Sequence, residues 1–141
     1  MSRIKIELPE HFLFECYFVI PISMINYGGH LGNDSILSIA QEARIQFLGH
    51  YGYSEMNFEG TGIIMNDAAV QYRSEGFHGN VLEIAIQPVN FHNFGFDLVY
   101  KIHNQTTQKD LAYLKTGILC FDYTKRKIAP LPPKILQLWN K

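Results

Sequence analysis

The residues best suited to chemistry lie in a short polar turn at residues 26–33, which reads NYGGHLGN. His30 is the one side chain of this turn that can take up a proton near neutral pH. The amide of Asn26 can orient a water molecule or a carbonyl group, but it is neither a nucleophile nor a base at neutral pH. A turn-forming Asn hydrogen-bonded to its own loop is the structural alternative for Asn26. The turn therefore predicts a polar binding site with His30 as a candidate proton acceptor.

A helix that starts directly after the turn predicts a place for negative charge. Asn33 and Asp34 are both favoured N-cap residues. Backbone N–H groups near Gly32 and Asn33 would point outward, with the positive end of the helix dipole behind them, and would suit a developing oxyanion. The apolar residues that follow lie on several faces of such a helix, so we expect it to be mostly buried: Ile36, Leu37, Ile39, Ala40, Ala43, Ile45, Phe47 and Leu48.

In order and spacing, these residues resemble the hot-dog-fold acyl-CoA thioesterases of the 4-hydroxybenzoyl-CoA thioesterase type. That family has a D-x-x-G-H-V-N-N turn and then a helix containing E-A-R, which correspond here to residues 26–33 and 41–44. The similarity continues through residues 69–73 and 79–83 to a last strand at 116–122, and covers roughly residues 12 to 130. One departure concerns the chemistry, because Asn26 stands where the family usually has its catalytic aspartate.

The resemblance implies an α+β hot-dog fold, in which a long central helix is wrapped by an antiparallel five-stranded sheet. We expect one domain over residues 1–141. Hydrophobic and turn patterns predict strands at residues 12–22, 62–73, 81–90, 96–103 and 111–123, and a short terminal helix at 134–139. One helix leaves apolar surface uncovered, and the family forms dimers that often pair into tetramers. We therefore expect a homodimer or homotetramer with an active site shared between subunits.

The function implied by the resemblance is hydrolysis of an acyl thioester of coenzyme A or of an acyl carrier protein. Asn26 and His30 would orient the thioester or the attacking water, and Asn33 would lie at the helix end that polarises the carbonyl. Glu42 is a possible base, because related hot-dog thioesterases of another clade place a carboxylate midway along this helix. A solvated or paired carboxylate, with Arg44 as one partner, is its structural alternative. We expect no cofactor, since coenzyme A is part of the substrate.

The candidate substrate-binding residues form two groups. Tyr27, Gly29 and Gly32 belong to the turn itself. Arg73 and the basic run Lys125, Arg126 and Lys127 would suit the phosphates of coenzyme A. A solvated surface turn is the structural alternative for the basic run.

Composition excludes several classes of protein. The net charge of −1 gives no electrostatic footprint for nucleic acid or an anionic membrane, and the longest apolar run is too short to cross a bilayer. Without an apolar core of signal-peptide length at the N-terminus, we expect a cytoplasmic protein. Cys16 and Cys120 are expected to be buried thiols, and the histidines show no metal-ligand spacing, so we predict no metal.

Two other functions stay open. A hot-dog dehydratase or hydratase uses a histidine with a helix carboxylate, and His30 with Glu42 offers such a pair. The sequence has neither the G-H-F-P turn of the dehydratases nor the D-x-N-x-x-H pattern of the hydratases. A noncatalytic acyl-binding hot-dog protein is the second alternative, and it would explain why Asn26 replaces an aspartate.

Overall fold

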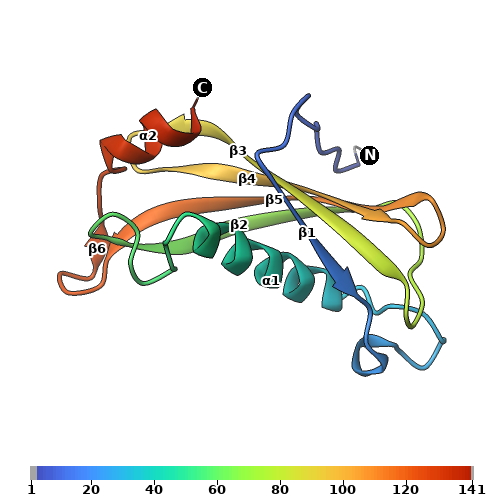
Figure 1. Ribbon diagram of the computed structural model, residues 1–141. Coiled ribbons are helices and arrows are strands. Elements are labelled where there is room, and N and C mark those ends of the chain that lie inside the picture. The colour runs from blue at the N-terminus through green and yellow to red at the C-terminus, as the bar shows by residue number, and fades with distance from the viewer. Residues whose placement is uncertain (1–2, 141) are drawn as a thin grey trace.

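The computed structural model describes residues 3–140, in which one long helix lies against one face of an antiparallel sheet (Figure 1). The order of the main strands is β1-β3-β4-β5-β2, and the short β6 pairs with β5. In chain order the elements are β1 (Phe14–Val19), the 3-10 turn η1 (Ile22–Met24), α1 (Ser35–His50), β2 (Gly62–Tyr72), β3 (Val81–His92), β4 (Gly95–Asn104), β5 (Lys109–Asp122), β6 (Lys127–Ile128) and α2 (Pro133–Trp139). The α+β prediction is confirmed, but the sheet has six strands because β6 adds a two-residue pairing after β5.

The core lies between α1 and the sheet. On β3, Leu82, Ile84 and Ile86 alternate along the strand and are fully buried, as their period of two predicts. The prediction of a mostly buried helix is wrong for this chain by itself: Leu37 and Ile45 stay 42% and 44% exposed. A single helix on a sheet can bury only the side that faces the sheet, so the opposite side of α1 keeps apolar groups in contact with solvent.

Strand β1 is shorter than the predicted range 12–22, for a reason that bears on the turn after it. Pro21 follows the strand and precedes η1, and its carbonyl accepts the N–H of Met24 at 3.2 Å. The chain therefore curls through a 3-10 turn before it reaches Asn26. The other predicted strands begin and end within two residues of those observed.

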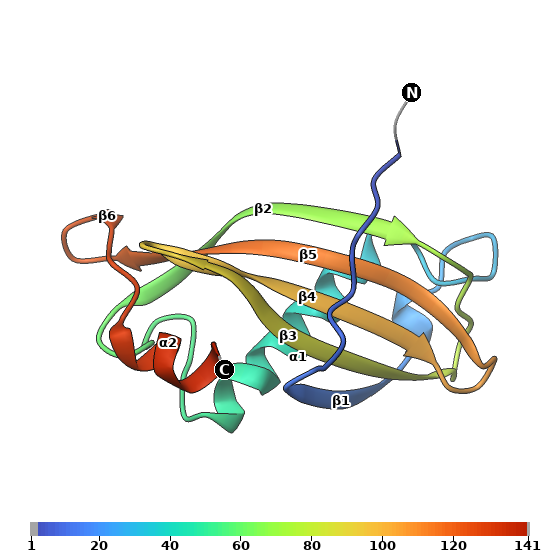
Figure 2. The same ribbon diagram turned by 90° about the horizontal axis from the view of Figure 1, so that it is seen from above.

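The N-terminal segment, residues 3–13, crosses the outer face of the sheet (Figure 2). The Ile6 N–H donates to Oε1 of Gln71 on β2 at 3.0 Å, and the Leu13 N–H donates to the Ile86 carbonyl on β3 at 3.1 Å. This segment and α1 therefore lie on opposite faces of the same sheet.

Both cysteines are buried and free, as predicted. Burial raises the pKa of the Cys120 thiol to about 11, and burial together with the nearby Glu42 carboxylate raises that of Cys16 to about 11. Neither thiol is therefore ionised near neutral pH. No helix within residues 3–140 is long and apolar enough to cross a membrane.

Candidate active site

The turn at residues 26–33 is closed by its own hydrogen bonds. The Asn26 N–H donates to the His30 carbonyl at 2.9 Å, and the Gly29 N–H donates to the Asn26 carbonyl at 3.0 Å. The Asn26 side chain accepts the Gly28 N–H at 2.9 Å, so its structural role, an Asn bonded to its own loop, is present. Gly29 has a φ of +86°, which a residue with a side chain rarely adopts. Tyr27, at the tip of the turn, is fully exposed.

Asn26 and His30 border the same small space beside Gly28. A methyl group added to Gly28 would lie 3.2 Å from Asn26 Oδ1 and 3.4 Å from His30 Nε2. His30 is half-buried, and its Nδ1 lies 3.4 Å from the Leu31 carbonyl oxygen. With the proton on Nδ1, facing that oxygen, Nε2 is left to accept a proton. A polar atom in this space would therefore meet an acceptor oxygen and a potential base.

At the start of α1, one of the two backbone amides expected to bind an oxyanion, that of Gly32, is already hydrogen-bonded. The Gly32 N–H already donates to the Met24 carbonyl at 3.0 Å, so it is not available to a ligand. The amides of Asn33 and Asp34, by contrast, donate to no hydrogen bond within the described residues. Asp34 is the N-cap, but its side chain does not cap the helix. The available donors are therefore the amides of Asn33 and Asp34, one residue further on than predicted.

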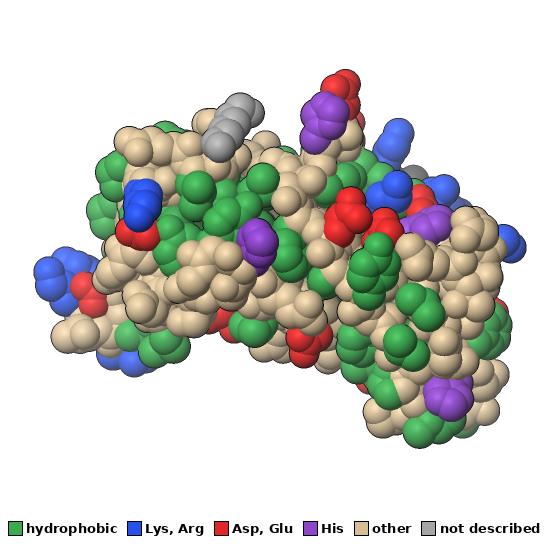
Figure 3. All heavy atoms as spheres, in the orientation of Figure 1, with side chains coloured by type: hydrophobic (Ala, Val, Ile, Leu, Met, Phe, Trp, Pro, Cys, Tyr) green, Lys and Arg blue, Asp and Glu red, His purple; other side chains and the backbone are tan. Residues whose placement is uncertain are grey.

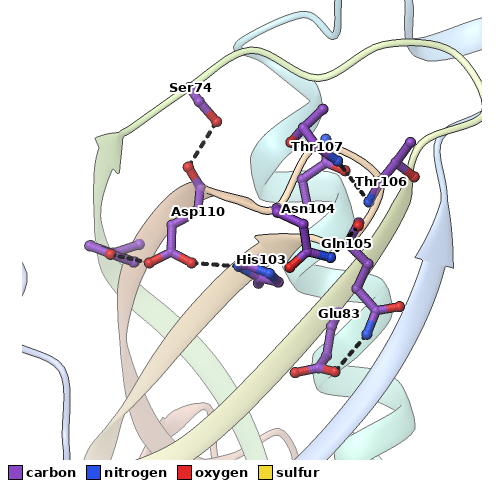
Figure 4. A network of polar contacts seen from close by, with 10 residues as sticks. Ser74, Glu83, His103, Asn104, Gln105, Thr106, Thr107 and Asp110 are labelled. Carbon is purple, nitrogen blue, oxygen red and sulfur yellow. Dashed lines mark hydrogen bonds and ion pairs between the residues drawn. The ribbon is translucent and has the colours of Figure 1, made fainter.

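Neighbouring loops hold the turn in place. The Leu31 N–H donates to the Gly76 carbonyl in the β2–β3 loop at 2.7 Å, and the Tyr72 hydroxyl donates to the Asn33 carbonyl at 3.3 Å. The loop is itself held by the polar network of Figure 4, in which Ser74 Oγ donates to the Asp110 carbonyl at 2.8 Å and His103 contacts the Asp110 carboxylate. The β4–β5 hairpin thus supports the turn indirectly, through the β2–β3 loop.

Glu42 does not join the turn within one protomer. Its carboxylate is exposed and accepts the Gln46 amide at 2.8 Å. It is also near enough to Cys16 on β1 to raise the pKa of that thiol. Eight residues separate it from Asp34, which corresponds to about 12 Å along the helix axis. Glu42 also does not pair with Arg44, which binds Glu55 instead.

The two basic groups lie at opposite ends of the sheet. Arg73 directly follows β2, with its guanidinium 5.4 Å from the centre of the Tyr113 ring. The basic run occupies the turn after β5 and the first residue of β6, seen as positive side chains at the left end of Figure 3. Since Gly62 pairs with Phe121 and Tyr72 with Ala112, about 33 Å of strand β2 separates the two ends. One protomer therefore does not bring both groups to one ligand.

Sequence reasoning missed a groove between α1 and β2. It has a volume of about 190 Å³ and is lined by Leu37, Ser38, Gln41, Arg44 and Met65. Three of these residues, at positions 37, 41 and 44, recur at helical spacing and so lie on one face of α1. An arginine on a helix face with an apolar residue was the sequence signal that could have predicted the groove.

Arg44 is 5% exposed and belongs to a buried polar network. Its Nε donates to the Glu55 carboxylate at 3.2 Å and its Nη1 to the Tyr100 hydroxyl at 3.1 Å. The Tyr100 hydroxyl is also 2.8 Å from Oγ1 of Thr116. Burial by itself would lower the pKa of Arg44, but Tyr100 and Glu55 raise it above its ordinary value. The guanidinium therefore stays charged inside the protein.

Within residues 3–140, no group of three His, Cys, Asp or Glu side chains is arranged to hold a metal ion. The residues of the turn and of the α1 N-terminus supply amide donors, an imidazole and a carboxamide.

Comparison with known families decides where the chain belongs. A family model described as the Thioesterase-like superfamily matches residues 20–138, from the end of β1 into α2. The chain belongs to this superfamily. Membership supports thioester hydrolysis in general, and the turn and α1 both lie inside the matched region. No curated protein sequence matches the chain.

Solved structures of other proteins share the architecture of this chain. The chain is similar to the 1,4-dihydroxy-2-naphthoyl-CoA thioesterase Slr0204 of Synechocystis, with a TM-score of 0.77, 20% identity, and coverage of 85% of this chain and 90% of that one. It is also similar to a protein of Aquifex aeolicus, with a TM-score of 0.79, 19% identity, and coverage of 89% of this chain and 98% of that one. A thioesterase superfamily protein of a Jannaschia species gives a TM-score of 0.77 and 14% identity, and the match covers 88% of this chain and 79% of that one. At these identities the likeness establishes the hot-dog fold, as expected from the sequence.

Proposed function

We propose that this protein hydrolyses acyl thioesters of coenzyme A at the turn before α1. One observation carries the proposal: residues 26–34 combine two kinds of polar group. The amides of Asn33 and Asp34 are available at the helix N-terminus, and His30 Nε2 and Asn26 Oδ1 border one small space beside Gly28. The choice of coenzyme A is supported by the Synechocystis neighbour, whose described substrate is a CoA thioester. No cofactor takes part in this scheme.

The chemistry needs an attacking water, a base and an oxyanion site. In the proposed reaction the water oxygen attacks the carbonyl carbon while its proton passes to Nε2 of His30. The amides of Asn33 and Asp34 bind the oxyanion of the tetrahedral intermediate. The intermediate then collapses, the carbon–sulfur bond breaks, and the imidazolium returns the proton to the leaving thiolate. The products are a carboxylic acid and free coenzyme A.

Asn26 and Glu42 have subordinate roles in this proposal. Asn26 Oδ1 accepts a hydrogen bond from the water that lies beside Gly28, which holds the water against Nε2 of His30. Glu42 is a candidate base only when a second protomer supplies it, because in its own protomer it lies about 12 Å along the helix from Asp34.

A noncatalytic acyl-binding protein is the second candidate, and one observation favours it. The position that carries the aspartate in the resembled family holds Asn26, whose oxygen is already bonded to the Gly28 amide. Such a protein would keep the amides at the α1 N-terminus for binding the thioester carbonyl but would lack turnover.

The test is a screen of acyl-CoA thioesters, from short to long and from alkyl to aryl, with free thiol detected by a chromogenic disulfide. We expect turnover by the wild-type protein, and a loss of about a hundredfold or more in His30→Gln, because the carboxamide cannot take the proton. Binding of acyl-CoA without thiol release would establish the noncatalytic alternative. Absence of both binding and release across the series would refute both.

A further inference from the structure

The groove between α1 and β2 has both polar and apolar lining residues, which is unusual for a site that receives an acyl chain. Leu37 and Met65 supply apolar walls, while Ser38, Gln41 and Arg44 supply polar atoms. A groove that received only alkyl chains would gain nothing from a charged group among its lining residues, because an apolar chain cannot satisfy it.

Arg44 has hydrogen-bond donors to spare. A guanidinium carries five N–H donors, and the hydrogen bonds to Glu55 and Tyr100 use only Nε and Nη1. Nη2 donates to no residue in the described part of the chain. Because Glu55 and Tyr100 fix the other two nitrogens and Arg44 lines the groove, Nη2 is the part of the guanidinium left to face it.

The position of Arg44 along α1 decides which part of a substrate it meets. Leu37 lies three residues after Asp34, about 4.5 Å along the helix axis, whereas Arg44 lies ten residues after it, about 15 Å away. An acyl group whose carbonyl is bound at the α1 N-terminus therefore passes Leu37 and Gln41 first. Its far end, and not its carbonyl, reaches the guanidinium.

We propose that this groove selects acyl groups that carry an oxygen at the end remote from the thioester, as a hydroxyl, keto or carboxylate group. Arg44 Nη2 donates to that oxygen, and Ser38 and Gln41 provide further hydrogen bonds along the way. An alkyl chain of equal length would leave these groups without partners, which is the strongest known basis for rejecting an analogue that lacks a polar group. This proposal rests on the proposed function, since it takes the α1 N-terminus as the place of the thioester carbonyl.

The experiment compares octanoyl-CoA with its ω-hydroxy and ω-carboxy counterparts in the wild-type protein. Hydrolysis is followed by thiol release, and binding of the matching non-hydrolysable thioethers is measured by calorimetry. We expect kcat/KM and affinity to favour an oxygen-tipped chain by roughly tenfold to a hundredfold, as a hydrogen bond to a charged donor provides. Equal values for all three chains would overturn the proposal and leave thioester hydrolysis intact. No hydrolysis of any chain would refute the proposed function, and the thioether affinities would still decide the selectivity.

Variants assign the selectivity to its residues. Arg44→Met, which keeps the length of the side chain but removes its donors, should abolish the preference. Because Arg44 is buried, this variant is checked by circular dichroism and thermal unfolding, and the double variant Ser38→Ala with Gln41→Leu provides a test on exposed helix positions that fold readily. The double variant should reduce the preference severalfold, because octanoyl-CoA then no longer covers polar groups that it cannot satisfy. Wild-type preference in the double variant and in a folded Arg44→Met would overturn the proposal.

Discussion

Asn26 and His30 lie four residues apart but contribute differently to the turn. Asn26 is committed to the backbone through its bond to the Gly28 amide, whereas the Nε2 atom of His30 borders a space that a ligand can enter. The His30 imidazole is the group of the turn that can take a proton from an attacking water, so His30 is the better-placed base. Asp34, which the sequence suggested only as a helix cap, is the nearest carboxylate along the chain.

Glu42→Gln separates the two candidate bases. We expect kcat to stay within about twofold of wild type, because Glu42 lies about 12 Å along the helix from Asp34 in its own protomer, whereas His30→Gln should lose about a hundredfold. Initial rates with a saturating acyl-CoA measure both. Asp34→Asn is the matched control, since it also replaces a carboxylate by a carboxamide and keeps the backbone amide of residue 34. A hundredfold loss in Glu42→Gln would show that a second protomer supplies Glu42 as the base.

Asn26→Asp tests the departure from the family pattern. The aspartate oxygen can still accept the Gly28 N–H, so the turn should keep its shape, and the variant gains a carboxylate beside the α1 N-terminus. We expect hydrolysis to rise by at least about tenfold, since a positioned general base contributes a hundredfold or more where none competes. Asn26→Ser, a smaller acceptor without charge, should show no such gain. An unchanged rate in Asn26→Asp would remove this position from the chemistry.

At the scale of elements, α1 does three things. Its N-terminus presents the amides of Asn33 and Asp34, its sheet-facing side forms the core, and its β2-facing side carries the groove residues. The β5–β6 turn stands apart from all three. It is shaped by Asp122, whose carboxylate accepts the N–H groups of Thr124 and Lys125 at 2.9 and 3.0 Å, so its basic side chains are left exposed.

Replacing Lys125, Arg126 and Lys127 together by Ala should raise KM for CoA thioesters severalfold and leave kcat nearly unchanged. The reason is that these residues would bind phosphates remote from the reacting carbonyl, and that contact weakens with salt. Steady-state kinetics at low and high ionic strength measures the effect. Pantetheine thioesters, which lack the nucleotide phosphates, should be unaffected, and an equal loss on them would contradict this role.

At the scale of the whole molecule, β2 is an exposed edge. It is eleven residues long, against six for the other edge strand β1, and its middle part from Met65 to Ala68 is exposed. Long exposed edges tend to pair with another strand. Two-fold antiparallel pairing of β2 with a second copy would bring the basic turn of one protomer toward the α1 N-terminus of the other, because these lie at opposite ends of β2.

We therefore expect at least a dimer in solution, with a mass of twice 16.2 kDa or more by light scattering at micromolar concentration. Met65→Asp places a charge on the exposed part of β2 and should shift the mass toward the monomer and reduce kcat/KM. Met56→Asp is the matched control, because Met56 is exposed to 67% in the loop before β2 and should leave the dimer intact. A monomeric wild type would contradict the shared site.

The sequence by itself determined the local features. The glycine turn, the helix after it, the alternation on β3 and the buried cysteines follow from backbone preferences and apolar periodicity, and each is observed. Tertiary structure decided what depends on long-range placement. In the folded chain the Gly32 amide donates to the Met24 carbonyl, and Glu42 lies near Cys16 of β1. Arg73 and the basic run lie at opposite ends of β2, and Arg44 is buried against Tyr100. None of these follows from spacing along the chain, because each depends on which residues from distant segments the sheet brings together.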